Sequence, residues 1–171
     1  MHFRGTLYRA LSPYWAYRPL SGDGAKQFGG RFNRPGRAAL YLAGSIETAL
    51  NEVQQAGMFA PVTLVAVEAD LEPLFDGRDA AALAAFDVGP ADLAIPDWAT
   101  RQAEEGQAPT QALAERLVEA GFCGMVVPSF APGARPEACN TVLWRWGAEL
   151  PHRLRLIDEQ NRLRHPPAPP L

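Results

Sequence analysis

The stretch GGRFNRPGRAALYLAGSIETALNE, residues 29–52, carries the clearest local signals in this 171-residue chain. Residues 29–36 form a compact loop with glycine or proline at both ends, a composition typical of turns. Residues 39–43 predict a short strand. Ser45 predicts the N-cap of a helix that ends before Gly57. The stretch therefore predicts a loop, a strand and a helix in direct succession.

The helix after Ser45 has two informative faces. Its apolar residues recur at the i, i+3, i+4, i+7 spacing of a stripe that faces the core: Ile46, Ala49, Leu50 and Val53. At 100° per residue, Ser45, Thr48 and Glu52 lie together on one flank of this stripe. We expect these three polar side chains to look into a cleft beside the core.

The rest of the chain mixes strands and helices without strict alternation. The expected strands are residues 3–9, 61–69, 122–127, 140–146 and 154–157, and residues 61–69 read as a central strand because both faces are apolar. The expected helices are residues 80–85, short pieces within 87–109, and one from Thr110 to Gly121, whereas residues 12–28 read as irregular and Asp76-Gly77 as a turn. This order predicts an α+β fold with a curved mixed sheet and flanking helices.

Length and composition indicate one folded domain. Hydrophobic residues make up 47% and charged residues 20% of the chain, which is ordinary for a globular protein with a single core. We expect this domain to span residues 1–160. Residues 161–171 are rich in proline, and we expect them to form a disordered tail.

Charge and cysteine usage narrow the class of protein. The net charge of -3 argues against direct binding of nucleic acid, because such domains are usually basic. The first residues lack the apolar region of a signal peptide, and no stretch is apolar for long enough to cross a bilayer, so we expect a cytoplasmic protein without membrane contact. Cys123 and Cys139 then favour two free thiols over a disulfide.

Several common catalytic and cofactor motifs are absent. The three histidines, His2, His152 and His165, lack metal-ligand spacing and the cysteines form no CxxC pair, so we expect no metal. Residues 22–26 fail the P-loop pattern, and the chain has no GxGxxG. Ser129 lacks the flanking glycines of a nucleophile elbow.

What remains is a set of polar residues at the edges of predicted elements: Arg9, Arg31, Tyr41, Ser45, Thr48, Glu52, Ser129 and Asn140. Arg31 follows two glycines that allow close approach of the backbone to a ligand, and a guanidinium can grip a phosphate with two hydrogen bonds. Tyr41 offers a flat ring face, and Glu52 a carboxylate that would steady positive charge on a sugar. Each residue also fits an ordinary structural role, so spacing alone leaves the function open.

The sequence resembles the RES domain family. The resemblance rests on GGRFN at 29–33, Gly36, Leu-Tyr-Leu-Ala at 40–43, Thr-Ala-Leu at 48–50 and Glu52. It continues with Leu-Tyr-Arg at 7–9 and Gly-Ala at 24–25, and then with Val-Pro-Ser at 127–129 and Asn-Thr-Val-Leu-Trp at 140–144, whereas residues 70–109 match nothing. The arginine, glutamate and serine of the family name fall on Arg31, Glu52 and Ser129.

The resemblance implies a fold similar to that of diphtheria-toxin-like ADP-ribosyltransferases. It also implies a toxin of a type II toxin–antitoxin pair, with an Xre-like antitoxin as partner and NAD+ as substrate. Glu52, Arg31 and Tyr41 would then be catalytic, and the dinucleotide would bind Arg9, Arg31, Tyr41, Thr48, Ser129 and Asn140, with Ser45 as a weaker candidate.

The reaction that the resemblance implies is cleavage of the nicotinamide–ribose bond and transfer of ADP-ribose to a cellular protein, which arrests growth. Hydrolysis or phosphorolysis of NAD+ at the same site is the first alternative. A non-catalytic nucleotide-binding module is the second. Leu50 stands two residues before Glu52, so the Glu-x-Glu motif of arginine-directed transferases is absent and other protein acceptors stay open.

Overall fold

The computed structural model describes residues 1–54 and 60–163, which form one α+β domain around a seven-stranded mixed sheet. The strands are β1 (Phe3–Leu11), β2 (Leu40–Ala43), β3 (Thr63–Leu71), β4 (Leu74–Asp76), β5 (Gly124–Pro128), β6 (Cys139–Leu143) and β7 (His152–Leu156). The helices are α1 (Asp23–Phe28), α2 (Ile46–Val53), α3 (Ala80–Ala84), α4 (Pro90–Leu93), α5 (Trp98–Glu105) and α6 (Pro109–Glu119), with a 3-10 turn at Pro13–Trp15.

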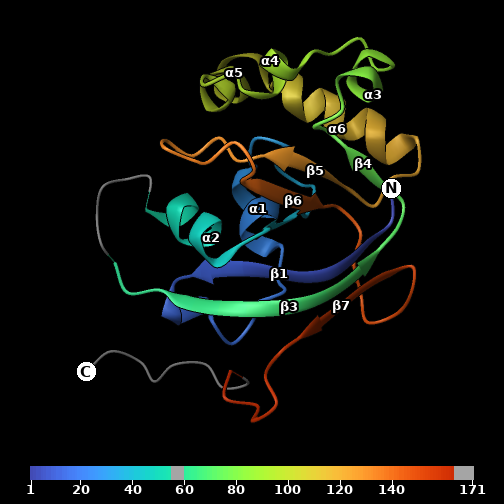
Figure 1. Ribbon diagram of the computed structural model, residues 1–171. Coiled ribbons are helices and arrows are strands. Elements are labelled where there is room, and N and C mark those ends of the chain that lie inside the picture. Colours follow the sequence, from blue (N-terminus) through green and yellow to red (C-terminus); the bar gives the residue numbers. More distant parts are fainter. Residues whose placement is uncertain (55–59, 164–171) are drawn as a thin grey trace.

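In the middle of the sheet, the pairing between β1 and β2 is limited to one residue pair. The strand order is β4-β5-β6-β2-β1-β3-β7, and only β4 and β5 run parallel. β1 pairs with β3 along its whole length, from Phe3 to Leu11, but it meets β2 in a single register pair, Tyr8 with Ala43. The long strands β1 and β3 therefore curve away below β2 and β6 (Figure 1), and the two halves of the sheet diverge.

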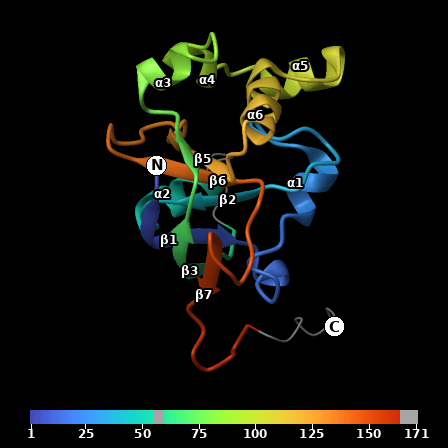
Figure 2. The ribbon, with the colours of Figure 1, turned by 90° about the vertical axis from the view of Figure 1, so that its right-hand side faces the viewer.

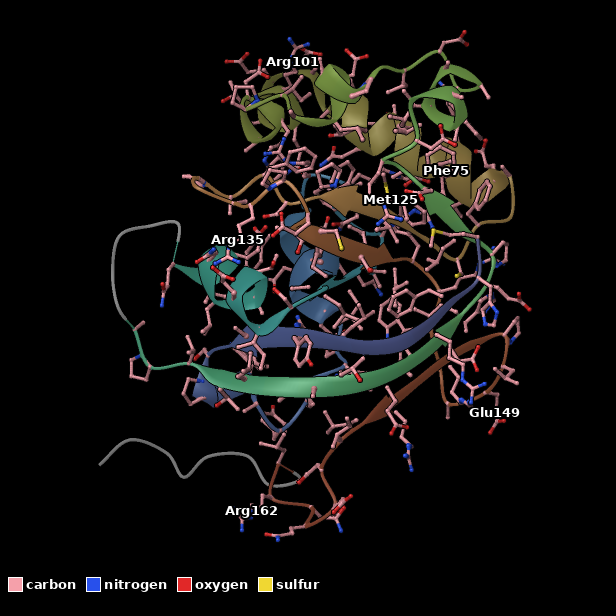
Figure 3. All side chains as sticks on the ribbon, in the orientation of Figure 1. Phe75, Arg101, Met125, Arg135, Glu149 and Arg162 are labelled. Carbon is pink, nitrogen blue, oxygen red and sulfur yellow. The ribbon has the colours of Figure 1, made fainter. Side chains whose placement is uncertain are left out.

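A layer of helices covers one side of the half of the sheet that contains β4, β5, β6 and β2. Helices α3 to α6 lie over β5 and β6 in both views (Figures 1 and 2). Leu113 and Leu117 of α6 pack in one buried cluster with Phe75 and Met125 of β4 and β5, and the last two are labelled beneath α6 in Figure 3. Removal of these side chains from water supplies the main attraction between the helices and the sheet.

The concave side of the sheet holds a second core, and α2 has a third, smaller one. The second cluster takes buried residues from all seven strands, so the sheet curls around it. Helix α2 rests on the junction of β1 and β2 through three buried alanines, Ala10, Ala43 and Ala49. Because alanine is small, α2 approaches the two strands closely at this junction.

The predicted α+β class, the single domain and the curved mixed sheet are confirmed. Residues 12–28 were expected to be irregular, which is wrong, because they contain the 3-10 turn and α1. The sequence also missed β4, which is only three residues long. Helix α2 ends at Val53, with Gln54 as its C-cap, which is before Gly57 as predicted. Most of the predicted tail at residues 161–171 falls on residues 164–171, which lie outside the described residues.

Three expectations about faces and caps are corrected. Residues 61–69 were predicted to be apolar on both faces in a central strand, but β3 alternates and leaves Leu64 more than one-third exposed, since only one face meets the core. Ile46 and Val53 were assigned to the core face of α2, yet both are exposed, because the alanine contact with the sheet is narrow. The N-cap of α6 is Ala108, one residue before Pro109, rather than Thr110.

Candidate active site

A hollow of about 310 Å³ opens where β1 and β2 diverge. It lies beside the single register pair of these strands, and α2 contributes the remaining wall. Its lining residues are Tyr8, Arg9, Ala10, Tyr41, Leu42, Ala43, Ala49, Glu52, Val53 and Asn140. We call this cavity the Glu52 hollow, because Glu52 is the acidic residue among its described lining residues.

Glu52 is held by two hydrogen bonds from distant parts of the chain. The Ser129 hydroxyl donates to Oε1 at 2.7 Å, and the Asn140 Nδ2 donates to the same oxygen at 2.6 Å. Bonds to an ionised acceptor are roughly twice as strong as neutral ones, so the two donors fix the carboxylate and partly replace its water. All three residues were predicted as site residues from the sequence, and the structure brings them together.

The backbone explains why these two donors reach Glu52. Asn140 lies on β6, where it is opposite Ala43 of β2 and Val127 of β5. Ser129 directly follows β5, and its amide donates to the carbonyl of Ala138 just before β6. Both donors therefore extend from the end of the β5–β6 hairpin, and α2 places Glu52 in front of it.

The loop before β2 is built around Tyr41 and Asn33. The Tyr41 hydroxyl donates to Asn33 Oδ1 at 2.7 Å and accepts from the amide of Phe32 at 3.1 Å. Burial raises the pKa of Tyr41 well above its usual value, so the hydroxyl stays protonated. A side chain at Gly30 would place a Cβ only 2.6 Å from that hydroxyl, which explains the glycine.

Two residues of α6 tie this loop to the helical layer. The Thr110 hydroxyl donates to the carbonyl of Arg31 at 2.5 Å, and the buried Gln111 side chain donates to the carbonyls of Gly30 and Asn33 at 2.8 and 3.1 Å. Neither contact was predicted from the sequence. One signal was present, because Thr110 stands at the i position of the buried stripe that continues with Leu113 and Leu117.

The Arg31 side chain points toward the helical layer. Its Nη1 donates to the carbonyls of Leu93 and Ile95 at 3.2 and 2.5 Å, and its guanidinium carbon lies 4.8 Å from the ring centroid of Phe130. Burial lowers the pKa of Arg31, while the charge of Glu52 works in the opposite direction. Arg31 is thus electrostatically coupled to Glu52, although it does not line the Glu52 hollow.

Arg9 occupies the other wall, on β1. Its Nη1 donates to the carbonyls of Pro19 and Ser21 at 2.6 and 3.0 Å, and burial lowers its pKa. A guanidinium keeps its charge even when its pKa falls by several units, so Arg9 brings a fixed positive charge to the cavity.

Thr48 and Ser45 lie elsewhere. The Ser45 side chain caps α2 by accepting from the Thr48 amide at 3.0 Å, and the two hydroxyls share a 2.8 Å hydrogen bond. Both residues line a separate hollow with Glu137 and Cys139. Neither residue lines the Glu52 hollow, although Thr48 stands four residues before Glu52 on α2. Their mutual hydrogen bonds give them a capping role.

The described residues show neither a metal-binding cluster nor a membrane-spanning helix. Within residues 1–54 and 60–163, no group of three or more histidine, cysteine, aspartate or glutamate side chains could hold a metal ion. In the same part of the chain, no helix combines the length and the apolar character needed to cross a membrane. Cys123 and Cys139 are free, as expected.

The fold and the site together define a class: α+β proteins in which a helix-borne glutamate is held in a cavity between two diverging strands. The chain belongs to the RES domain family, which it matches over residues 6–164. It is also similar to a chain of the M. tuberculosis MbcT–MbcA toxin–antitoxin complex, with a TM-score of 0.64 and 25% identity. That match covers 92% of this chain and 84% of the other. No curated protein matches the sequence.

Proposed function

We propose that this protein is the toxin of a toxin–antitoxin pair that binds NAD+, cleaves the nicotinamide–ribose bond and transfers ADP-ribose to a cellular protein. One observation carries the proposal: the Glu52 carboxylate is fixed by Ser129 and Asn140 at the wall of a cavity that also contains Arg9. Membership of the RES domain family and the likeness to the MbcT–MbcA complex support it.

The chemistry of NAD+ explains what such a carboxylate would do. Nicotinamide leaves as a neutral molecule, and the ribose carbon that it leaves passes through a transition state with oxocarbenium character. A negative charge beside the sugar stabilises that state more than the ground state, which is what acceleration requires. Glu52 supplies this charge and an acceptor for a ribose hydroxyl.

The other residues take supporting roles. Ser129 and Asn140 donate to Glu52, so their main role is to orient the carboxylate rather than to bind substrate. The Tyr41 ring lines the same hollow and offers a face for the nicotinamide. Arg9 supplies positive charge for the pyrophosphate, and Arg31 places a second guanidinium near Glu52.

The decisive experiment follows free nicotinamide after the purified protein is mixed with NAD+. Parallel reactions contain buffer alone, added phosphate, or cell lysate. Release that requires lysate, together with ADP-ribose mass on a lysate protein, supports transfer. Rapid release in buffer or only with phosphate replaces transfer by hydrolysis or phosphorolysis at the same site. A protein that binds NAD+ but releases no nicotinamide in any reaction is a nucleotide-binding module.

The toxin proposal has a separate test in cells. Expression of this chain alone should arrest growth, and expression together with its cognate antitoxin, which we propose to be Xre-like, should restore it. The Glu52→Gln variant should be harmless at the same expression level. Normal growth with the unchanged chain would contradict the toxin role, which we propose is exerted in the cytoplasm.

A further inference from the structure

A second hollow of about 260 Å³ lies next to the Glu52 hollow. The two cavities share one lining residue, Arg9, which stands between them. The other lining residues come from the end of β1, the 3-10 turn and α1: Leu11, Trp15, Arg18, Ser21, Asp23, Gly24, Gln27 and Phe28. We call this cavity the Trp15 hollow.

The walls of the Trp15 hollow are aromatic and open to solvent. Trp15 is 54% exposed and Phe28 is 69% exposed, unusually high values for side chains that gain from burial. A flat base stacks favourably on an exposed aromatic side chain, because every base has a π face. Gln27 adds an amide that can pair with adenine at N6 and N7, the bidentate contact that glutamine makes with this base.

The charges around the Trp15 hollow place the anionic part of a ligand at one end. Arg18 is neutralised by Asp23, which it contacts at 2.6 Å. Arg9, in contrast, donates only to the backbone carbonyls of Pro19 and Ser21 among its described contacts. The uncompensated guanidinium is therefore at the boundary with the Glu52 hollow, which is where the phosphates of a ligand that spans both cavities would lie.

Size argues for one ligand across both cavities. Pockets for small molecules usually enclose about 300–1,000 Å³. The Glu52 hollow, at about 310 Å³, is at the lower limit of this range. NAD+ consists of two nucleotides joined through their phosphates, so it needs two adjoining cavities with a cation between them.

We propose that the Trp15 hollow is the subsite for the adenosine monophosphate half of NAD+, with the adenine on Trp15, its edge toward Gln27 and its phosphate on Arg9. This assignment rests on the proposed function, because it presupposes that the nicotinamide half occupies the Glu52 hollow. It gives the 3-10 turn and α1 a role in substrate recognition.

The chain offers a variant that fills this hollow without disturbing the fold. A Cβ added at Gly24 meets no atom within 4 Å, and Gly24 has no positive φ. Leucine there also favours a helix more than glycine does. Gly147 has the same two properties but lines neither hollow. Gly24→Leu is therefore the test variant, and Gly147→Leu is its matched control.

The first measurement is binding of AMP, which does not depend on catalysis. AMP should bind the unchanged protein and Gly147→Leu with equal affinity, and it should quench the fluorescence of Trp15. Trp15→Ala should weaken AMP about 10-fold, within the range expected for loss of base stacking. Gly24→Leu should weaken AMP by at least as much. Equal affinity in all four proteins overturns the proposal.

The second measurement compares two substrates. Gly24→Leu and Trp15→Ala should raise the KM for NAD+ about 10-fold, and neither should alter turnover of nicotinamide mononucleotide, which lacks the adenosine half. A loss of turnover on both substrates, as after general damage, contradicts the assignment. AMP binding without nicotinamide release would support the subsite and refute the proposed reaction. Nicotinamide release that neither variant alters would support the reaction and refute the subsite.

Discussion

The Glu52→Gln variant isolates the charge of the carboxylate from its hydrogen bonds. The Glu52 Oε1 atom accepts from Ser129 and Asn140 at 2.7 and 2.6 Å. A glutamine carbonyl oxygen can accept both bonds, so the position of the side chain is kept. Only the negative charge is lost, and with it the attraction to the developing ribosyl cation.

The expected size of the effect follows from Coulomb's law. Two unit charges about 4 Å apart attract by roughly 4 kcal/mol at an effective dielectric constant near 20. Each 1.36 kcal/mol changes a rate tenfold, so kcat should fall by about 10²–10³. Removal of a single electrostatic stabiliser from other enzymes has effects of the same order.

The assay is release of nicotinamide under saturating NAD+, with NAD+ affinity measured separately by calorimetry. Affinity should change by less than about fivefold, since the positive charge of bound NAD+ lies on the nicotinamide ring and passes to the ribose only toward the transition state. Glu47→Gln is the control, because Glu47 lies on the same helix, is more than half exposed and pairs loosely with Arg135 at 3.5 Å; Figure 3 labels Arg135 beside α2. A folded Glu52→Gln protein with a kcat within twofold of the unchanged protein refutes the role of Glu52.

Three further predictions concern stability and reactivity. Gly30→Ala should lower the free energy of unfolding by about 1–3 kcal/mol, because its Cβ would lie 2.6 Å from the tyrosine hydroxyl that holds the loop; thermal melting measures this, and an unchanged melting temperature contradicts it. The hydrogen bond from Arg37 lowers the pKa of Glu115, so its stabilisation is present at neutral pH and is lost as pH falls through that lowered pKa; the stability gap between the unchanged protein and Glu115→Gln should therefore shrink in acid. Burial raises the pKa of Cys123 to about 11, so iodoacetamide at pH 8 should label Cys139 and spare Cys123 until the protein is denatured.

The region from residue 29 to residue 52 could be predicted from sequence because its signals are local. The turn residues at 29–36 and the N-cap at Ser45 act within a few residues of themselves, and both are found as predicted. The faces of α2 were predicted less well. A stripe of apolar residues indicates burial only if the surface opposite is wide enough, and here the contact with the sheet is limited to small residues such as Ala49.

Long-range contacts of polar side chains could not be predicted in this way. Ser129 and Asn140 were predicted as site residues from their places at the edges of expected strands and from the family resemblance, but nothing in their local sequence shows that both donate to one oxygen of Glu52. Gln111 was missed altogether, because a glutamine on a helix is usually solvated. Its burial becomes understandable only when the carbonyls of Gly30 and Asn33 are placed opposite its amide.

The contacts of Arg9 and Arg31 change which of the two we expect to bind phosphate. From the sequence, Arg31 was predicted to be the main phosphate anchor, because it follows two glycines. In the structure, Nη1 of Arg31 is engaged by the carbonyls of Leu93 and Ile95, and its guanidinium lies against Phe130. A ligand that recruited all of this guanidinium would have to break those bonds. Nη1 of Arg9 is also bonded to two carbonyls, those of Pro19 and Ser21. Arg9 nevertheless lines both cavities, so its other N–H groups can meet a pyrophosphate there. We therefore expect Arg9→Ala to weaken NAD+ binding more than Arg31→Ala, and Arg31→Ala to loosen the α4–α5 segment as well.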